Sequence, residues 1–131
     1  IHRGRPDRRA ISVALDALQK GRRIIIAPEG RESTNGVLEK GTQGAAFLAL
    51  KSGVLVVPVT ITGSELRIIE NGLKKFHRMP VSVKIGEGFT LQPSDAHQDS
   101  LEAGTRLIME SLARQLPPRY RGVYAYLEEQ E

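Results

Sequence analysis

The chain has 131 residues, of which 26% are charged and 40% are hydrophobic, so it fits one globular domain with a modest core of its own. Its 13 Gly and 7 Pro are too few for a collagen-like or low-complexity chain, and the lack of Cys excludes a disulfide framework, a thiol nucleophile and a Cys-based zinc site. The formal net charge of +4 favours anionic partners such as phosphates, acidic lipids or nucleic acid, without choosing among them.

The first half of the sequence predicts a helix, a strand, a second helix and a second strand. Apolar residues recur at helical spacing over residues 7–20, and Gly21 would end that helix. The β-branched run at 24–27 predicts a short buried strand. A second helix is expected over residues 41–51, and residues 54–62 predict another buried strand.

A strand, a helix and a strand in this order predict a right-handed parallel unit, because crossovers of this kind have that handedness almost without exception. The expected fold class is therefore α/β, a mixed and mostly parallel sheet flanked by helices. Residues 81–85 alternate like an edge or half-exposed strand, and a last helix is expected over 101–116. We expect 1–131 to form a single domain, with residues 119–131 as a loosely held tail.

The start of the chain and its longest apolar runs bear on whether the domain is truncated and whether it crosses a membrane. The sequence starts at Ile1 with no initiator Met and no signal-peptide pattern, so we expect the domain to be N-terminally truncated, with this chain its C-terminal portion. The apolar runs fall well short of the roughly 20 residues that cross a bilayer.

The stretch from residue 24 to residue 40 is the most informative part of the sequence. Gly30 and Gly36 allow close approach to the backbone, and Arg31 offers a fork of donors suited to phosphate or carboxylate. Lys40 stands where a helix N-terminus already favours anions. The loop therefore suits an anionic ligand, although a connecting loop whose charges are merely solvated would show the same composition.

Four ordered motifs resemble the lysophospholipid and glycerol-phosphate acyltransferase family, whose best-known members act on lysophosphatidic acid. The four motifs are Ile1-His2-Arg3, Ile26-Ala27-Pro28-Glu29-Gly30-Arg31-Glu32-Ser33, Lys40-Gly41-Thr42-Gln43-Gly44-Ala45-Ala46 and Val56-Val57-Pro58-Val59. Together they run through much of the chain and occur in the family's order, which makes the resemblance specific.

The resemblance implies transfer of an acyl group to the free hydroxyl of a lysophospholipid, namely lysophosphatidic acid giving phosphatidic acid. The co-substrate would be a thioester of coenzyme A or acyl carrier protein, with no bound cofactor and no covalent acyl-enzyme. It also implies an enzyme of phospholipid biosynthesis in a bacterial cell, in the cytoplasm and peripherally associated with the anionic inner leaflet of the membrane.

The resemblance also implies roles for individual residues. Arg3, Glu29, Gly30 and Lys40 occupy positions associated with the glycerol-phosphate acceptor, and two further residues, Val57 and Pro58, would line the acyl or acceptor pocket.

One departure from the family pattern concerns the head group of the acceptor. Arg31 and Glu32 stand where Thr-Arg is usual, so a carboxylate occupies the expected phosphate-binding place. We still assign the phosphate to Arg3, Arg31 and Lys40, provided that Glu32 turns outward or pairs with a base. A lyso-lipid with a different head group is the alternative acceptor.

A second departure concerns the catalytic base. In the family a His-x-x-x-x-Asp motif supplies the base and its orienting carboxylate, and it lies well before the second motif. His2 and Asp7 have that literal spacing but fall within or beside the second motif, so we interpret Asp7 as a helix cap and His2 as a neighbour of Arg3. We therefore expect the base upstream and this chain alone to be inactive. A non-catalytic lipid or acyl-carrier binding module is the alternative.

The remaining candidates are interpreted mostly as structural. The basic stretch 74–78 would touch anionic lipid or be merely solvated. Asp95, His97 and Asp99 are interpreted as capping sequence before a helix, and no metal is assigned. The tyrosines of the tail are expected to pack. With 5% aromatic residues and no RNA-binding signature, a nucleic-acid partner is not expected.

Overall fold

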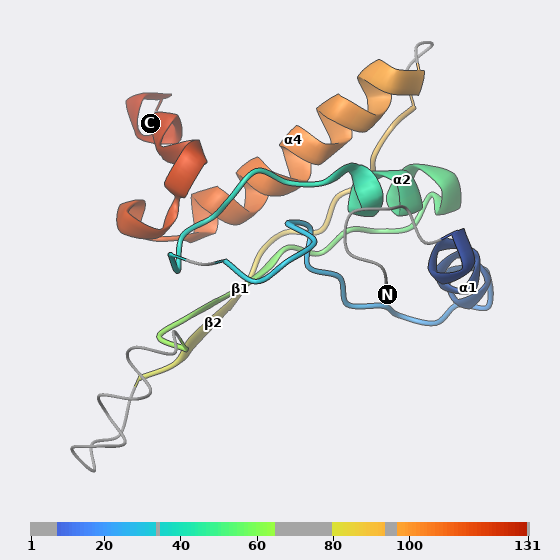
Figure 1. Cartoon of the computed structure of the whole chain (residues 1–131), viewed down its shortest axis with the longest axis horizontal. Coiled ribbons are helices and arrows are strands. Elements are labelled where there is room, and N and C mark those ends of the chain that lie inside the picture. Colours follow the sequence, from blue (N-terminus) through green and yellow to red (C-terminus); the bar gives the residue numbers. More distant parts are fainter. Residues whose placement is uncertain (1–7, 34, 65–79, 94–96, 131) are drawn as a thin grey trace.

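The computed structural model describes residues 8–33, 35–64, 80–93 and 97–130. These residues form helices of up to 19 residues and a small sheet that projects from them, shown in Figure 1. In chain order the elements are α1 (Arg8–Gln19), α2 (Gln43–Ser52), β1 (Val59–Thr62), β2 (Ser82–Ile85), α4 (His97–Gln115) and the 3-10 helices η1 (Pro118–Tyr120) and η2 (Gly122–Gln130).

The helices form where the apolar periodicity predicts them. Helix α1 ends just before Gly21, α2 ends at Gly53 in the left-handed conformation that closes many helices, and α4 ends before Pro117. Asp7, interpreted as the cap of the first helix, lies outside the described residues. Within the part of the chain that the structure describes, no helix has both the length and the apolar character needed to cross a bilayer.

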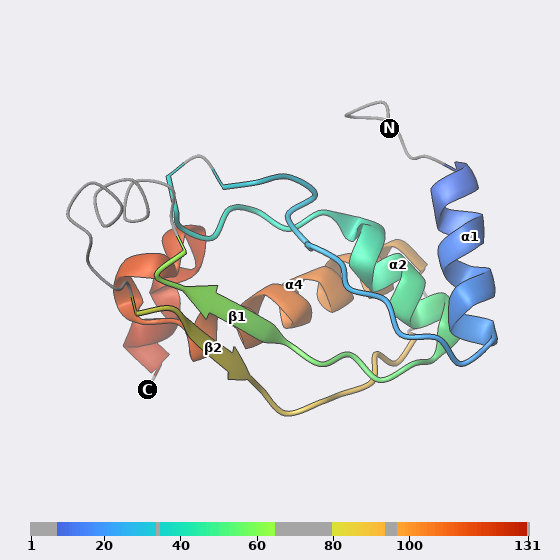
Figure 2. The ribbon, with the colours of Figure 1, turned by 90° about the horizontal axis from the view of Figure 1, so that it is seen from below.

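The core lies on the helical side of the molecule. Helix α4 runs alongside α2 and beneath β1, and η2 folds back onto its C-terminal half (Figure 2). Small side chains at the contacts let the helices approach closely, because Ala46 and Ala113 are completely buried together with the larger Met109. Leu101, Ile108 and Leu112 of α4 complete the apolar stripe that the sequence predicts.

The sheet of the described residues consists of two antiparallel strands. Val59 lies opposite Ile85 and Thr62 opposite Ser82, and an isolated bridge between Val56 and Phe89 extends the pairing toward the helices. The mixture of helices and strands agrees with the expected class. The mostly parallel arrangement stays a prediction, since the described pairs are all antiparallel.

The run at 54–62 alternates sharply in burial. Pro58 and Thr60 are buried on the side where Gln115 of α4 donates a hydrogen bond to the Pro58 carbonyl at 3.4 Å. Val57 and Ile61 point the other way and are 46% and 57% exposed. The prediction of a buried strand is therefore correct for one face of this run and wrong for the other.

The β-branched run at 24–27 differs from its prediction. Residues 24–27 belong to no strand in the structure, and Ile24, Ile25 and Ile26 are all exposed, Ile25 completely. Apolar β-branched residues favour strands, but a strand also needs a neighbouring backbone that pairs with its N–H and C=O groups. No neighbouring strand is present in the described residues, so the run stays a connection without regular secondary structure.

The end of the chain is more firmly packed than the expected loose tail. Arg121, Tyr124 and Leu127 are buried, and the Nε of Arg121 donates to the carbonyl of Leu116 at 3.1 Å. The expectation of a loosely held segment from residue 119 onward is thus wrong for residues 119–127. The turn at Pro117 sends the chain back along α4, where these side chains find apolar partners.

Candidate functional site

The loop between residues 28 and 42 is closed at its neck by three hydrogen bonds. The backbone N–H and the hydroxyl of Thr42 both donate to the carbonyl of Pro28, at 2.8 and 3.0 Å. The backbone N–H of Glu39 donates to the Glu29 carboxylate at 2.7 Å. The start of α2 is therefore tied to the Pro28-Glu29 end of the loop, and Glu29 acts as an internal acceptor for the loop backbone.

Gly30 sits at the sharpest point of this loop. Its φ of 72° is in the left-handed region, and its N–H donates to the carbonyl of Ala27 at 3.0 Å. A Cβ at this position would lie 3.3 Å from the Thr42 methyl carbon, tighter than an ordinary contact. The predicted use of Gly30 for close backbone approach therefore has a geometric reason, namely the approach of the helix start.

The charged side chains of the loop lie at its surface. The guanidinium of Arg31 pairs with the carboxylate of Glu39, and their side chains are 70% and 18% exposed. Lys40 is exposed and makes no ion pair with any residue that the structure describes. Glu32 is exposed as well, so it is free to turn outward, as a phosphate beside it would require.

Glu39 is a site residue that the sequence analysis missed. Its carboxylate forms an ion pair with the guanidinium of Arg31, and its backbone N–H donates a hydrogen bond to the Glu29 carboxylate. Its place next to Lys40 was the available signal, because an acidic residue beside a basic loop is a candidate partner for the loop's arginine. Which arginine it meets depends on how the loop folds.

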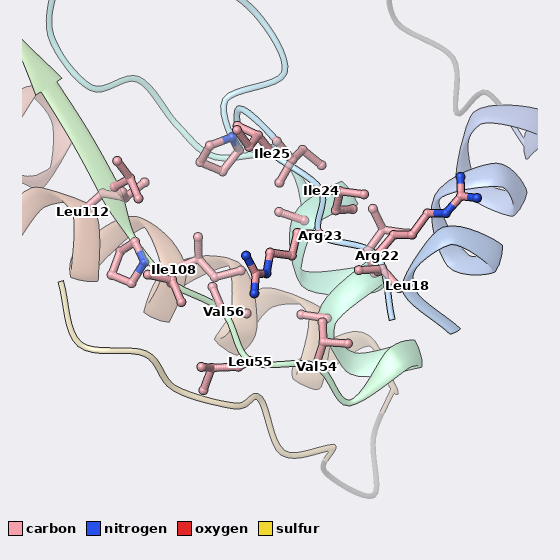
Figure 3. A pocket seen from close by; sticks show the side chains of 18 of the residues that line it. Leu18, Arg22, Arg23, Ile24, Ile25, Val54, Leu55, Val56, Ile108 and Leu112 are labelled. Carbon is pink, nitrogen blue, oxygen red and sulfur yellow. The ribbon is translucent and has the colours of Figure 1, made fainter. Parts of the chain in front are cut away.

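An apolar pocket of about 620 Å³ adjoins the loop. Val57 and Pro58 line it, and Pro28 belongs to its wall, so the pocket reaches the first residue of the loop neck. Figure 3 shows Ile24 and Ile25 on one side and Leu55 and Val56 on the other, with Ile108 and Leu112 contributed by α4. The pocket therefore lies between the two apolar runs that the sequence predicted to be strands.

Two arginines that the sequence analysis did not single out also line this pocket. In Figure 3 the side chain of Arg23 extends between the two apolar runs, whereas Arg22 points toward α1. Both are exposed. The signal in the sequence was a pair of basic residues placed directly before an apolar run, which puts cations at the entrance of any cavity that the run lines.

The C-terminal segment holds the helix-start side of the loop. The Gly41 N–H donates to the hydroxyl of Tyr124 at 3.2 Å, and the Leu38 N–H donates to the carbonyl of Tyr120 at 2.9 Å. The N–H of Val123 donates in turn to the carbonyl of Leu38 at 3.3 Å. The packing expected of the tail tyrosines is thus confirmed for Tyr124, which also has a polar contact that no local pattern indicates.

Several predicted residues lie outside the described part of the chain. These are Arg3, His2 and Asp7, the basic stretch 74–78, and Asp95. Asp99 lies exposed in the first turn of α4, which fits its interpretation as part of a helix start. Among the described residues no group of three or more His, Asp and Glu side chains gathers in a way that could hold a metal ion.

Comparison with known proteins agrees with the motifs. Residues 1–62 match the model of the Acyltransferase family. A stretch of 50 residues is 40% identical to a chloroplastic 1-acyl-sn-glycerol-3-phosphate acyltransferase of Arabidopsis thaliana and covers 38% of this chain. That stretch amounts to 14% of the length of the relative. No solved structure matches the chain.

Proposed function

We propose that the complete gene product is an O-acyltransferase of phospholipid biosynthesis, on the premise that residues 1–62 are acyltransferase-like, as both the motifs and the family match show. It would transfer an acyl group from an acyl-CoA or acyl carrier protein thioester to lysophosphatidic acid, giving phosphatidic acid. The observation that carries the proposal is the continuity of a basic loop with an apolar pocket through Pro28. A substrate with a charged head and a long acyl chain needs that combination.

The head group of the acceptor is assigned to the loop. Lys40 stands two residues before Thr42, the N-cap of α2, near the unsatisfied N–H groups that favour an anion, and Arg31 pairs with Glu39 in the same loop. A phosphate dianion would compete with one carboxylate for the guanidinium of Arg31. Arg3 is proposed as a third phosphate ligand and lies outside the described residues.

The acyl chain is assigned to the apolar pocket. Val57 is exposed toward it, and Pro58 forms part of its wall next to α4. Each methylene that leaves water for such a surface contributes about 0.8 kcal/mol, so a few carbons suffice to hold the chain in place. The pocket and the loop together would set the distance between the acyl carbons and the phosphate.

In the proposed reaction the acceptor hydroxyl attacks the thioester carbonyl carbon. A C–O ester bond forms, the C–S bond breaks, the hydroxyl proton passes to a general base, and the thiol leaves with a proton. The base belongs to the His-x-x-x-x-Asp motif that the resemblance implies. The described residues of this chain bind and orient the acceptor, so we propose that this chain alone is inactive.

The mostly parallel sheet is part of the same proposal. Residues 24–27 and 54–57 are both apolar and lie outside the helices, and α2 connects them in the order that a parallel crossover requires. Runs that are apolar on both faces are typical of parallel strands covered on both sides. In this arrangement the two runs belong to one sheet without pairing with each other, because the apolar pocket separates them. The exposed isoleucines of the first run support this arrangement for the complete gene product.

Membrane attachment is also proposed rather than observed. The substrate is a lipid, the chain carries a net charge of +4, and Arg22 and Arg23 flank the pocket. Each basic side chain near an anionic lipid surface contributes roughly 1 kcal/mol of attraction. We propose peripheral attachment to the anionic cytoplasmic leaflet in a bacterial cell.

Charge reversal in the loop tests the function. Lys40→Glu and Arg31→Glu in the complete gene product should each raise the KM for lysophosphatidic acid about tenfold or more, because each removes a charge-assisted contact to phosphate. Lys51→Glu, at the other end of α2, is the matched control and should leave the KM unchanged. Unaltered KM values in both loop variants would contradict the phosphate assignment.

The same assay separates the alternatives for the acceptor and the activity. Turnover of a choline- or ethanolamine-bearing lyso-lipid in preference to lysophosphatidic acid would favour the different head group, to which the Arg31–Glu39 pair and the exposed Glu32 are better suited. Binding of lysophosphatidic acid without turnover by the complete gene product would favour a non-catalytic binding module.

A further inference from the structure

The C-terminal segment meets the candidate phosphate loop although the two are far apart in sequence. The Tyr124 hydroxyl and the Gly41 N–H are separated by 83 residues and lie 3.2 Å apart. Both backbone polar groups of Leu38 are hydrogen-bonded to this segment. Its N–H donates to the Tyr120 carbonyl, and its carbonyl accepts from the Val123 N–H. This segment lies beyond residues 1–62, which are the part that matches the family model.

We propose that residues 120–124 hold the phosphate loop in its binding conformation, and that Tyr124 is a positioning residue for the acceptor phosphate. It acts through the peptide between Lys40 and Gly41. The proposal rests on the proposed function, because it assigns a second layer of support to the same acceptor site. Tyr124 does not itself touch the substrate.

The peptide between Lys40 and Gly41 is also held by packing against α4. A Cβ at Gly41 would lie 2.5 Å from the Cγ of Met109 and 3.1 Å from the methyl carbon of Thr105, so residue 41 sits directly against α4 with no room for a side chain. Met109 is completely buried and offers little room for movement. Packing fixes where the peptide lies, and the Tyr124 hydroxyl fixes its rotation.

The position of this peptide matters because Lys40 directly precedes Gly41. The Tyr124 hydroxyl holds the backbone at Gly41, and the two bonds from Thr42 to the Pro28 carbonyl hold the next residue, so the point from which the Lys40 side chain leaves the loop is fixed. A backbone that moved freely there would spread the cation over several positions, and the acceptor would have to order it on binding.

Tyr124 is suited to this task by its own rigidity. Its ring is buried in the cluster that contains Met109 and Leu127, and it lies 6.3 Å from the ring of Tyr126. A tyrosine has only two side-chain rotations, so a buried ring carries its hydroxyl at a well-defined position. The core of α4 is thereby connected to the loop by one hydrogen bond.

Tyr124→Phe in the complete gene product tests the proposal, because it removes one oxygen and keeps the ring. We expect the KM for lysophosphatidic acid to rise about three- to tenfold, the effect of one hydrogen bond, with kcat nearly unchanged since the thioester chemistry is not touched. Hydrogen exchange of the Gly41 amide should become faster.

Two variants serve as controls. Tyr126→Phe removes the same oxygen from a ring whose hydroxyl bonds Glu110, on the solvent side of α4, and should leave both the KM and the Gly41 exchange unchanged. Leu127→Val loosens the same core without removing any bond to the loop. It should lower the thermal midpoint and leave the KM unchanged.

Three results would overturn the proposal: an unchanged KM and unchanged Gly41 exchange in Tyr124→Phe, an equal rise of KM in Leu127→Val, or a fall of kcat with KM unchanged. A titration with inorganic phosphate, followed at the Gly30 and Gly41 amides by NMR, separates this from the proposed function. Should the unaltered complete gene product fail to transfer acyl groups, the proposed function is wrong. Weaker phosphate binding by Tyr124→Phe would still support the proposal that Tyr124 keeps the phosphate loop in its binding conformation.

Discussion

The apolar residues on the helical side of this molecule are buried, whereas many of those on the strand side are exposed. Met109, Ala113 and Leu127 on the helical side are buried almost completely. Ile25, Ile61 and Ile85 on the strand side are largely exposed, although isoleucine is no less apolar than the buried residues of the helical side. From the sequence, Ile25 and Ile61 are predicted in buried strands, Ile85 in a half-exposed strand and Leu127 in a loosely held tail.

The difference follows from what each element needs. A helix satisfies its own backbone hydrogen bonds and requires one apolar partner along one face, which α2, α4 and the C-terminal segment provide for each other. A strand that is apolar on both faces requires backbone partners at its edges and a layer on each side. Only one face of the run at 54–62 meets α4, so the other face stays exposed.

The strongest test of this comparison is a pair of core and strand truncations. Met109→Ala should lower the free energy of unfolding by about 2–5 kcal/mol, because it leaves a cavity between α2 and α4. Val83→Ala, in β2, whose four residues are all exposed, should change it by less than about 0.5 kcal/mol. Urea unfolding of both variants measures the contrast, and equal losses would show that the strand face is covered.

The second prediction concerns the C-terminal segment. Leu127→Ala should cost about 2–4 kcal/mol, since this side chain is buried against α4. Ala125→Ser, on an exposed position of the same segment, should cost less than about 0.5 kcal/mol. If thermal unfolding shows no loss for Leu127→Ala, the segment is not part of the folded core.

The third prediction tests whether the exposed run at residues 24–27 forms a strand in the complete gene product. In the chain described here, Ile25→Ser should change stability by less than about 0.5 kcal/mol, because Ile25 is fully exposed. In the complete gene product, where the proposed sheet pairs this run, the same substitution should cost about 1–3 kcal/mol. A negligible effect in both proteins would contradict the proposed parallel sheet.

The smallest expected effect is a change in stability at alkaline pH. Partial burial raises the pKa of Tyr126 above 10.0, and its hydrogen bond to Glu110 raises it further. A raised pKa means that the folded state keeps the phenol proton longer than the unfolded state, so this contribution is present below the unfolded pKa and is lost as the pH rises through the folded one. Tyr126→Phe should therefore flatten the fall of the unfolding midpoint above about pH 10. A parallel fall in both proteins would refute this.

Much of the candidate site could be predicted from local sequence. Glu29, Gly30, Arg31 and Lys40 lie in one loop before α2, and Val57 and Pro58 line a pocket, while their roles toward a substrate stay predictions. These predictions rest on residues close together in sequence, where the spacing of Gly, Pro and charges constrains the backbone directly. The partner of Arg31 could not be predicted, because Glu39 reaches it only once the loop has closed.

The sequence by itself determined the helices, the position of the loop and the residue types at its surface. Each of these depends on hydrogen bonds and apolar periodicity within a few residues. The tertiary structure decided which apolar runs are buried, how the C-terminal segment returns along α4, and that Tyr124 meets Gly41 across 83 residues. Such contacts depend on how whole elements pack, and packing is a property of surfaces that meet only after the chain has folded.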